Sequence, residues 1–165
     1  MRLASEDGTV VELRPLRFQF GPSSEPRDWD ANWLCITGDV VLPDSRAWSF
    51  TDPCLTTWEA RRLGSWLEGV VAGDVRPGPY TGETDERLLA FTEPNLAFSL
   101  AQRLEGDVTI RVHLSLEARP PWPVGSESDA QPDLFDYYVE VRLAQHALAK
   151  GVSSWTQELS AFPIR

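Results

Sequence analysis

The sequence lacks the long apolar runs that would place it in a membrane or mark it for export. No stretch approaches the roughly 18 consecutive apolar residues that a membrane-spanning helix requires. The segment from Met1 to Gly8 contains no apolar run of the kind found in signal peptides. These two absences predict a cytoplasmic protein with no membrane partner.

Cysteine and histidine, the usual ligands of zinc, are scarce, with two residues of each. Cys35 and Cys54 form no C-x-x-C pair and have no paired histidines beside them, so we expect no zinc site. A disulfide between them stays open, but reduced cysteines filling small apolar spaces are more typical of a cytosolic chain. His113 and His146 both fall on predicted polar faces, where a solvated histidine is commoner than a catalytic one.

Catalytic motifs are also missing. The sequence contains no G-x-S-x-G, no phosphate-binding G-x-x-x-x-G-K-S/T, no H-E-x-x-H and no G-x-G-x-x-G. We therefore expect neither an enzyme nor a bound cofactor. The main alternative rests on acids such as Asp30 and Asp52, because paired carboxylates can serve hydrolysis or bind a divalent cation. Both acids equally suit a turn or the approach to a helix, where aspartate accepts backbone hydrogen bonds.

What the sequence does contain is typical of one globular domain. Its 165 residues, 42% apolar and 24% charged, suffice to enclose a hydrophobic core, and we expect a single domain over 1–165. The net charge of −10 disfavours direct binding to nucleic acid, because an acidic surface repels phosphates. The same charge would attract a basic protein partner and speed its encounter, although acidity also serves simply to keep a protein in solution.

Three predicted connections are long: 21–32, 73–86 and 118–133. Loops of this length are uncommon in a compact domain unless they are mobile or functional. Eleven of the 25 acids lie in or beside them. These acids are Glu25, Asp28, Asp30, Asp74, Glu83, Asp85, Glu86, Glu127, Asp129, Asp133 and Asp136.

Apolar residues alternate with polar ones through several segments, and this pattern predicts half-buried antiparallel strands. The segments are 34–42, 46–50, 87–92, 96–104, 108–116 and 135–143. Near the N-terminus the alternation changes phase at Pro15, which predicts a β-bulge or an edge strand. We expect an α+β fold whose mainly antiparallel sheet has about seven strands.

Two helices are predicted beside these strands. Thr56 as N-cap and Glu59 three residues later form a capping box, which begins a helix over 56–72. An apolar stripe along this helix would face the sheet. A second helix is expected over 144–160, with Trp155 on its inner face, although Gly151 is unfavourable in a helix interior.

Three of the seven tryptophans lie outside the predicted strand faces. Trp29 stands between two acids, Asp28 and Asp30; Trp122 lies in a proline-rich connection, and Trp58 projects away from the apolar stripe of its helix. Aromatic residues among acids are typical of a binding face, so we predict that these five residues contact a partner. The alternative is structural: Trp29 and Trp58 pack on each other or beneath a loop.

Short motifs in the first half of the chain resemble the bacterial WapI-type immunity proteins. The motifs lie in Asp30–Leu34, Gly38–Val40 and Trp48–Ala60, and the closing Phe162–Arg165 is similar too. Proteins of that family are associated with contact-dependent toxin systems, in which the namesake neutralises a tRNA-cleaving toxin domain by binding it. The resemblance implies a non-catalytic protein with a cognate toxin as its partner, but it carries over no contact residues.

The charge of the chain is compatible with this resemblance. A tRNA-cleaving domain must present a basic groove to phosphates, and an acidic inhibitor would occupy that groove as an electrostatic mimic. The alternatives are a small-ligand-binding protein or carboxylate-based hydrolase with a cleft near Asp30 and Asp52, and an unspecialised interaction domain. A deep pocket with converging acids would favour the hydrolase, whereas an exposed acidic face bearing tryptophan would favour the immunity protein.

Overall fold

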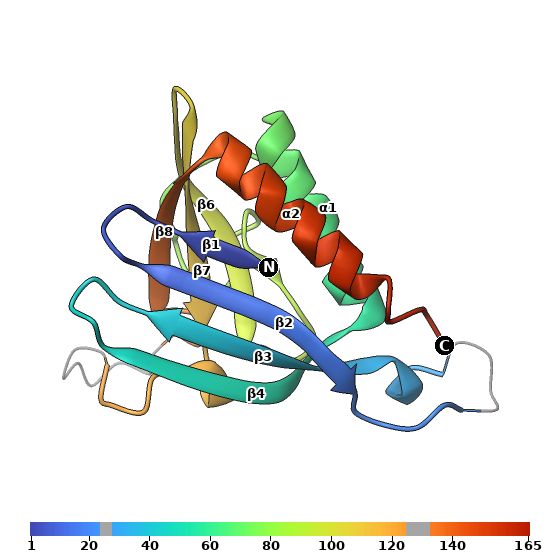
Figure 1. Ribbon diagram of the computed structural model, residues 1–165. Helices are drawn as coiled ribbons and strands as arrows, with labels where there is room; N and C mark the ends of the chain where they lie inside the picture. Colours follow the sequence, from blue (N-terminus) through green and yellow to red (C-terminus); the bar gives the residue numbers. More distant parts are fainter. Residues whose placement is uncertain (24–27, 125–132) are drawn as a thin grey trace.

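The computed structural model describes residues 1–23, 28–124 and 133–165, and within them the strands form two antiparallel sheets of four strands each (Figure 1). Sheet A has the order β1-β2-β3-β4 and sheet B the order β5-β6-β7-β8. The strands are β1 Arg2–Ala4, β2 Val10–Phe18, β3 Trp33–Val41, β4 Ala47–Thr56, β5 Leu89–Ala90, β6 Leu96–Leu104, β7 Asp107–Leu114 and β8 Tyr138–Ala144. The predicted α+β class is confirmed, with the strands divided between two sheets.

Two α-helices and two short 3-10 helices complete the described elements: α1 Thr57–Ala72, α2 Gln145–Leu159, η1 Asp30–Asn32 and η2 Leu116–Ala118. Helix α1 follows sheet A in the chain and α2 follows sheet B, and the two helices pack against each other. No helix in the described part of the chain is long and apolar enough to cross a membrane.

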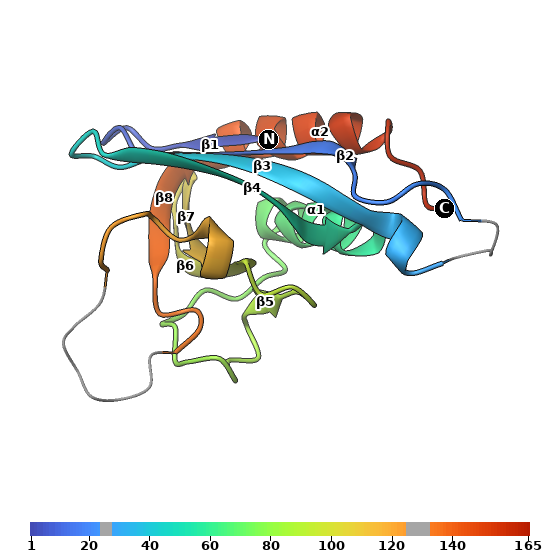
Figure 2. The same cartoon turned by 90° about the horizontal axis from the view of Figure 1, so that it is seen from below.

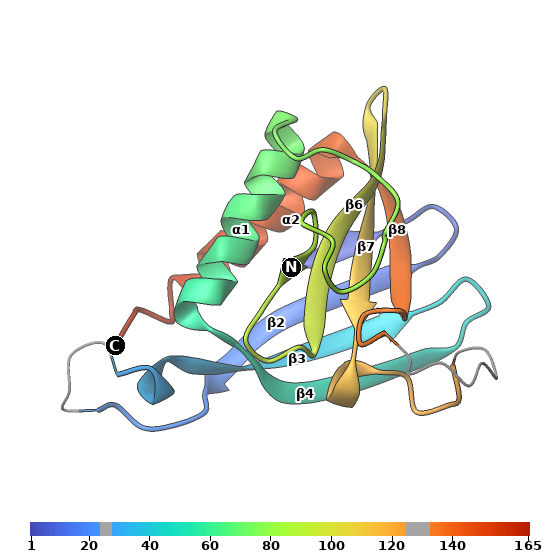
Figure 3. The same cartoon turned by 180° about the vertical axis from the view of Figure 1, so that it is seen from behind.

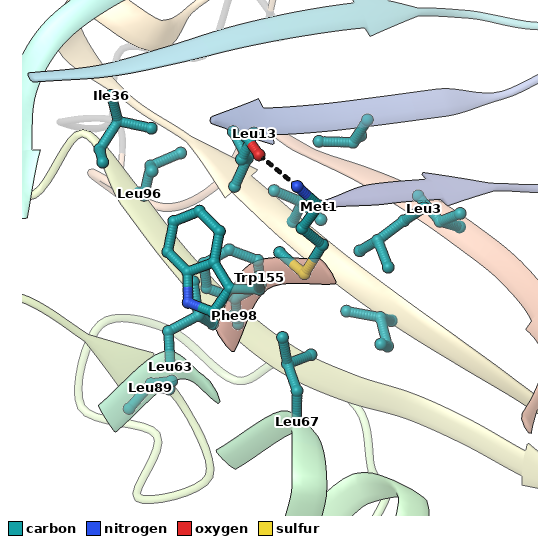
Figure 4. Packing of buried hydrophobic residues seen from close by; sticks show 14 of the residues in the cluster. Met1, Leu3, Leu13, Ile36, Leu63, Leu67, Leu89, Leu96, Phe98 and Trp155 are labelled. Carbon is teal, nitrogen blue, oxygen red and sulfur yellow. Dashed lines mark hydrogen bonds between the residues drawn. The ribbon is translucent and has the colours of Figure 1, made fainter. Parts of the chain in front are cut away.

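The hydrophobic core lies where the two sheets and the helix pair meet. Figure 2 views sheet A along its edge, with β6, β7 and β8 on one side of it. Figure 4 shows the centre of this core, to which both sheets and both helices contribute: Leu13, Ile36, Leu63, Leu67, Leu96, Phe98 and Trp155. The backbone nitrogen of Met1 donates to the carbonyl of Leu13 at 2.7 Å and so holds the first residue inside the core.

Helix α1 begins with the predicted capping box. The Thr56 hydroxyl oxygen accepts the backbone N–H of Glu59 at 3.2 Å, and Glu59 Oε2 accepts the N–H of Thr56 at 2.8 Å. The second carboxylate oxygen of Glu59 accepts the N–H of Thr92 at 2.8 Å, in the connection between β5 and β6. One buried carboxylate therefore joins the end of sheet A, the start of α1 and the approach to sheet B.

Helix α2 agrees with its predicted range and inner face. Its fully or nearly buried residues are Leu148, Gly151, Val152, Trp155 and Leu159. A Cβ at Gly151 would lie 3.4 Å from the backbone oxygen of Arg2. An added methyl group would lie at ordinary van der Waals distance from β1, so α2 packs against β1 at this glycine despite its poor helix propensity.

Several strand boundaries differ from the prediction, because edge strands and β-bulges tolerate proline and register shifts that a central strand does not. The register shift at Pro15 confirms the predicted bulge in β2. Strand β4 continues past the predicted end at Phe50 to Thr56. It can include Pro53 because β4 is an edge strand, where proline is tolerated. Its pairing with β3 also shifts register between Leu34 and Cys35. Strand β5 is only two residues long, but it lies within the predicted segment 87–92 and pairs antiparallel with β6.

Strands β7 and β8 are shifted relative to the predicted 108–116 and 135–143. The chain leaves β7 after Leu114, and Leu116 adopts a positive φ of 48° at the start of η2. Phe135 is buried although it precedes β8, which begins at Tyr138. Alternation predicted the buried side of both strands correctly but not the points where pairing stops.

The cysteines are free and buried, as expected for a reduced pair. Cys35 in β3 lies opposite Pro53 in β4, and Pro53 is the residue before Cys54, so the two cysteines are on adjacent strands. Burial raises the pKa of the Cys54 thiol, so this thiol stays protonated and unreactive.

His113 contradicts the prediction of a polar, solvated face. Its side chain is fully buried, because the segments around Tyr80 and Phe135 cover the outer side of sheet B. The backbone carbonyl of Phe135 accepts a hydrogen bond from Nδ1 at 2.7 Å, and Ser99 Oγ lies 3.0 Å from Nε2. With Nδ1 donating, Nε2 accepts from the Ser99 hydroxyl, so both ring nitrogens are satisfied in the neutral form. His146 is exposed, as predicted.

The buried His113 predicts a loss of stability at acidic pH. Burial lowers the pKa of His113 below its ordinary value of 6.5, and the charge of Arg111 acts in the same direction. The unfolded chain therefore takes up a proton that the folded chain refuses, and stability falls as pH drops below 6.5. We expect wild type to lose up to about 1.4 kcal/mol more per pH unit than His113→Gln, measured by urea unfolding between about pH 7 and pH 5. His146→Gln is the control and should follow wild type; equal pH profiles for wild type and His113→Gln would contradict the assignment.

Candidate partner-binding surface

Two tryptophans from different segments stack at one end of sheet A. The ring of Trp29 lies parallel to that of Trp58, with centroids 5.3 Å apart and an interplanar angle of 18°. Trp33 meets Trp29 edge-on at 6.4 Å. Trp29 still exposes 48% of its surface, so the stacked pair is open to a partner on one side.

The backbone beneath this pair is held by the buried side chain of Asn32. Its amide nitrogen donates to the carbonyl of Asp28 at 2.7 Å, and its amide oxygen accepts the Thr57 hydroxyl at 2.7 Å. The same oxygen accepts the backbone N–H of Arg165 at 3.0 Å. One side chain therefore fixes the segment before β3, the start of α1 and residue 165 relative to one another, and Trp29 sits on a rigid base.

Two carboxylates flank Trp29 in the chain. Asp28 Oδ1 accepts the backbone N–H of Asp30 at 3.0 Å, which closes a turn around Trp29. A hydrogen bond from the Ser23 side chain and then the bond from Asp30 lower the pKa of Asp28, so it is ionised at neutral pH. Asp30 is exposed in the first turn of η1. Both acids therefore present negative charge beside the tryptophan pair.

Two exposed apolar side chains lie at the same end of the molecule. Phe20 is 49% exposed and Ile164 is 44% exposed. Arg165 ties their segments together, because its guanidinium stacks 3.4 Å from the ring centroid of Phe18 and donates to the carbonyl of Phe20 at 3.1 Å. Figure 1 shows η1 and residue 165 at this end. We call this surface the tryptophan end; its residues are Phe20, Asp28, Trp29, Asp30, Trp58 and Ile164.

Sequence reasoning predicted four of these six residues and missed Phe20 and Ile164. Phe20 continues the apolar alternation that follows Pro15, which gave no sign of a binding surface, but the strand ends at Phe18. The only sequence signal for Ile164 was its place in the closing Phe162–Arg165 motif.

The predicted Trp122 lies elsewhere. Its ring packs edge-on against Trp48 at 5.3 Å, and the guanidinium of Arg46 lies 5.1 Å from its centroid. Trp48 is near the first residue of β4, whereas Trp58 follows the last, so about 8 strand residues and roughly 26 Å separate the two regions. The structure thus brings Trp29, Trp58 and the two acids together and leaves Trp122 apart.

The carboxylates proposed for hydrolysis do not converge. Asp52 lies opposite Ile36 within sheet A, beside Asn95, whose amide contacts it at 3.4 Å. Burial raises the pKa of Asp52, and the nearby charges of Glu117 and Glu93 add to this effect. Asp30 lies in η1, before β3 begins, whereas Asp52 pairs with the fourth residue of β3, so the two acids lie at different places along sheet A. Within residues 1–23, 28–124 and 133–165, no group of three or more potential ligands is placed to hold a metal ion.

Comparison with known proteins agrees with a binding role. No curated protein matches the chain. The family model for the immunity protein WapI-like family matches residues 2–163, which is nearly the whole chain. Membership implies neutralisation of a toxin and suggests a non-catalytic protein. The chain therefore belongs to the immunity protein WapI-like family.

Proposed function

We propose that this protein neutralises a cognate toxin domain by binding it through the tryptophan end, without catalysis. The observation that carries the proposal is the stacked pair of Trp29 and Trp58, half open to solvent on a hydrogen-bonded base and flanked by two acids. Tryptophan dominates the energetics of many protein interfaces, particularly where it is already held in its bound geometry. Little conformational entropy remains to be lost when a partner covers these rings.

The charge of the chain supports a basic partner, and we propose a nuclease that cleaves RNA. A net charge of −10 speeds the approach of a positively charged protein, and Asp28 and Asp30 place part of that charge beside the aromatic contact. A nuclease domain must carry a positive groove for phosphates, so an acidic face with an aromatic centre complements it. Co-expression with a toxic nuclease domain chosen from the adjacent genes should restore growth of the poisoned cells; failure to restore it with every such domain would refute the proposal.

The charge contribution of Asp28 and Asp30 has its own test. We expect Asp28→Asn/Asp30→Asn to slow association with that toxin domain about threefold to tenfold at low salt and to flatten the dependence of the association rate on salt. Asparagine at residue 28 keeps the acceptor for the N–H of Asp30, so the turn survives. Stopped-flow fluorescence measures the rates.

The matched control for this experiment is Glu6→Gln/Glu105→Gln, which changes the net charge equally. Both residues are exposed, and they lie in the β1–β2 and β6–β7 turns, away from the tryptophan end (Figure 1). If the control slows association as much as the aspartate pair does, the steering comes from net charge alone and not from this surface.

A further inference from the structure

A hollow of opposite charge lies further along α1. It has a volume of about 510 Å³ and opens between the outer side of the helix and the segment that follows it. Figure 3 shows that segment leaving the end of α1 and running past β6 and β7 before it reaches β5. The lining residues that matter are Arg62, Trp66, Val75, Arg76, Arg87 and Leu88.

Three arginines and one carboxylate, Glu86, line this hollow, so its lining carries a net positive charge although the chain as a whole has a net charge of −10. Arg87 is neutralised by Asp85, whose carboxylate lies 2.8 Å from its Nε. Neither Arg62 nor Arg76 forms an ion pair with any residue that the structure describes, and the one hydrogen bond of Arg62, to the carbonyl of Ala90, is long at 3.4 Å. Two guanidinium groups are therefore available for a negatively charged ligand, to which arginine donates in pairs.

The base of the hollow is apolar. Trp66 is half-buried, with its ring centroid 6.2 Å from that of Phe98 in the core. Val75 and Leu88 are half-buried beside it. An aromatic floor ringed by arginine is the composition of an interface hot spot rather than of a solvated face.

The hollow and the tryptophan pair share one side of α1. Trp58, Arg62 and Trp66 are spaced four residues apart, so they form a stripe along the helix surface. Eight residues of helix span roughly 12 Å, a distance that a single partner domain covers easily. The stripe begins beside the acids of the tryptophan end and finishes in the basic hollow.

We infer that the hollow is a second docking site on the same partner-binding surface, and that it receives aspartate or glutamate side chains of the partner protein with an apolar neighbour on Trp66. Charge complementarity selects this occupant, because the two unpaired arginines favour carboxylates while the floor favours an apolar group. The identity of the partner as the toxin domain rests on the proposed function. The partner would then carry a basic patch and an acidic patch about 12 Å apart.

A short acidic peptide tests the hollow without the toxin. Acetyl-Glu-Phe-Glu-Glu-amide is titrated into ¹⁵N-labelled protein while the indole N–H signals are followed by NMR. We expect a saturating shift of the Trp66 signal with a Kd below about 10 mM, and at least a fivefold weaker Kd in Arg62→Glu/Arg76→Glu. Lys150→Glu and its wild-type parent serve as controls, because Lys150 is exposed on α2, outside the hollow. Thermal unfolding confirms that each variant is folded.

The inference would be overturned by no saturation with wild type, by equal binding of the neutral peptide acetyl-Gln-Phe-Gln-Gln-amide, or by undiminished binding by Arg62→Glu/Arg76→Glu. Saturation of the same signal by inorganic phosphate alone would assign the hollow to a free anion and would also overturn it. None of these outcomes depends on Trp29 or on a toxin. A negative peptide titration therefore leaves the proposed function unaffected. A negative toxin experiment leaves the peptide titration as the test of the hollow.

Discussion

Replacing Trp155 with alanine should remove about 4 kcal/mol from the free energy of unfolding. The Trp155 side chain is fully buried and belongs to the cluster that joins the helix pair to both sheets (Figure 4). Its indole Nε1 donates to the carbonyl of Ala60 in α1 at 2.8 Å, and its ring lies 3.5 Å from where a Cβ would stand on Gly64. The truncation leaves a large cavity between α1 and α2 and removes the donor that satisfies a buried carbonyl.

Urea unfolding of three variants separates these contributions. Trp155→Phe keeps most of the packing and loses the hydrogen bond, so we expect a loss of about 1–2 kcal/mol. Trp29→Ala makes the same truncation at an exposed ring and should cost less than about 1 kcal/mol. If Trp155→Ala and Trp29→Ala proved equally stable, Trp155 would not be the packing centre between the helices.

The helices could be predicted because their signals are local. The capping box of Thr56 and Glu59 involves residues three apart, and the apolar face of α2 repeats every three or four residues. The sequence could not reveal that Glu59 also accepts a bond from Thr92, since that contact joins residues 33 apart. Local patterns specify where a helix begins, but tertiary contacts decide what else its cap holds.

His113 and Phe20 show why alternation misassigns some faces. Alternation places His113 on the outer side of β7, which is correct, yet that side is covered by segments that carry Tyr80 and Phe135. Phe20 continues the pattern of β2 but follows its last paired residue, and it becomes exposed. For His113 the error lies in the covering of the face, which depends on long connections whose paths the sequence does not encode locally. For Phe20 the apolar pattern runs past the end of the paired strand.

The candidate site was partly predictable for a similar reason. The stacking of Trp29 on Trp58 was one of two interpretations open from the sequence, and the structure shows that stacking leaves Trp29 half exposed. The separation of Trp122 could not be predicted, because it follows from the direction of β4 and from the contact with Trp48. A ring that packs on its neighbour can still be open to a partner, since the half-buried ring of Trp58 supports the exposed ring of Trp29.

The fold explains why this end of the molecule suits recognition. Asn32 joins three segments by hydrogen bonds at 2.7–3.0 Å, and Glu59 holds the first turn of α1 against both sheets. Under the proposed function, a partner would meet rings that are already in place, which would reduce the entropy lost on binding. The same buried polar side chains, Asn32 and Glu59, join the segments of the fold and hold the surface tryptophans in position.

Removing the exposed ring of Trp29 tests the central claim most directly. The measurement is the dissociation rate of the complex with the toxin domain that co-expression identifies, compared between wild type and Trp29→Ala by surface plasmon resonance. Leu104→Ala is the control, because Leu104 is 46% exposed at the end of β6, away from the tryptophan end. Trp122→Ala shows in the same series whether the surface extends to the other end of β4.

We predict that Trp29→Ala dissociates about 30-fold faster than wild type, which corresponds to roughly 2 kcal/mol, with little change in the association rate. Leu104→Ala should dissociate at the wild-type rate. A folded Trp29→Ala that dissociates as slowly as wild type would contradict the claim that the tryptophan end binds the toxin.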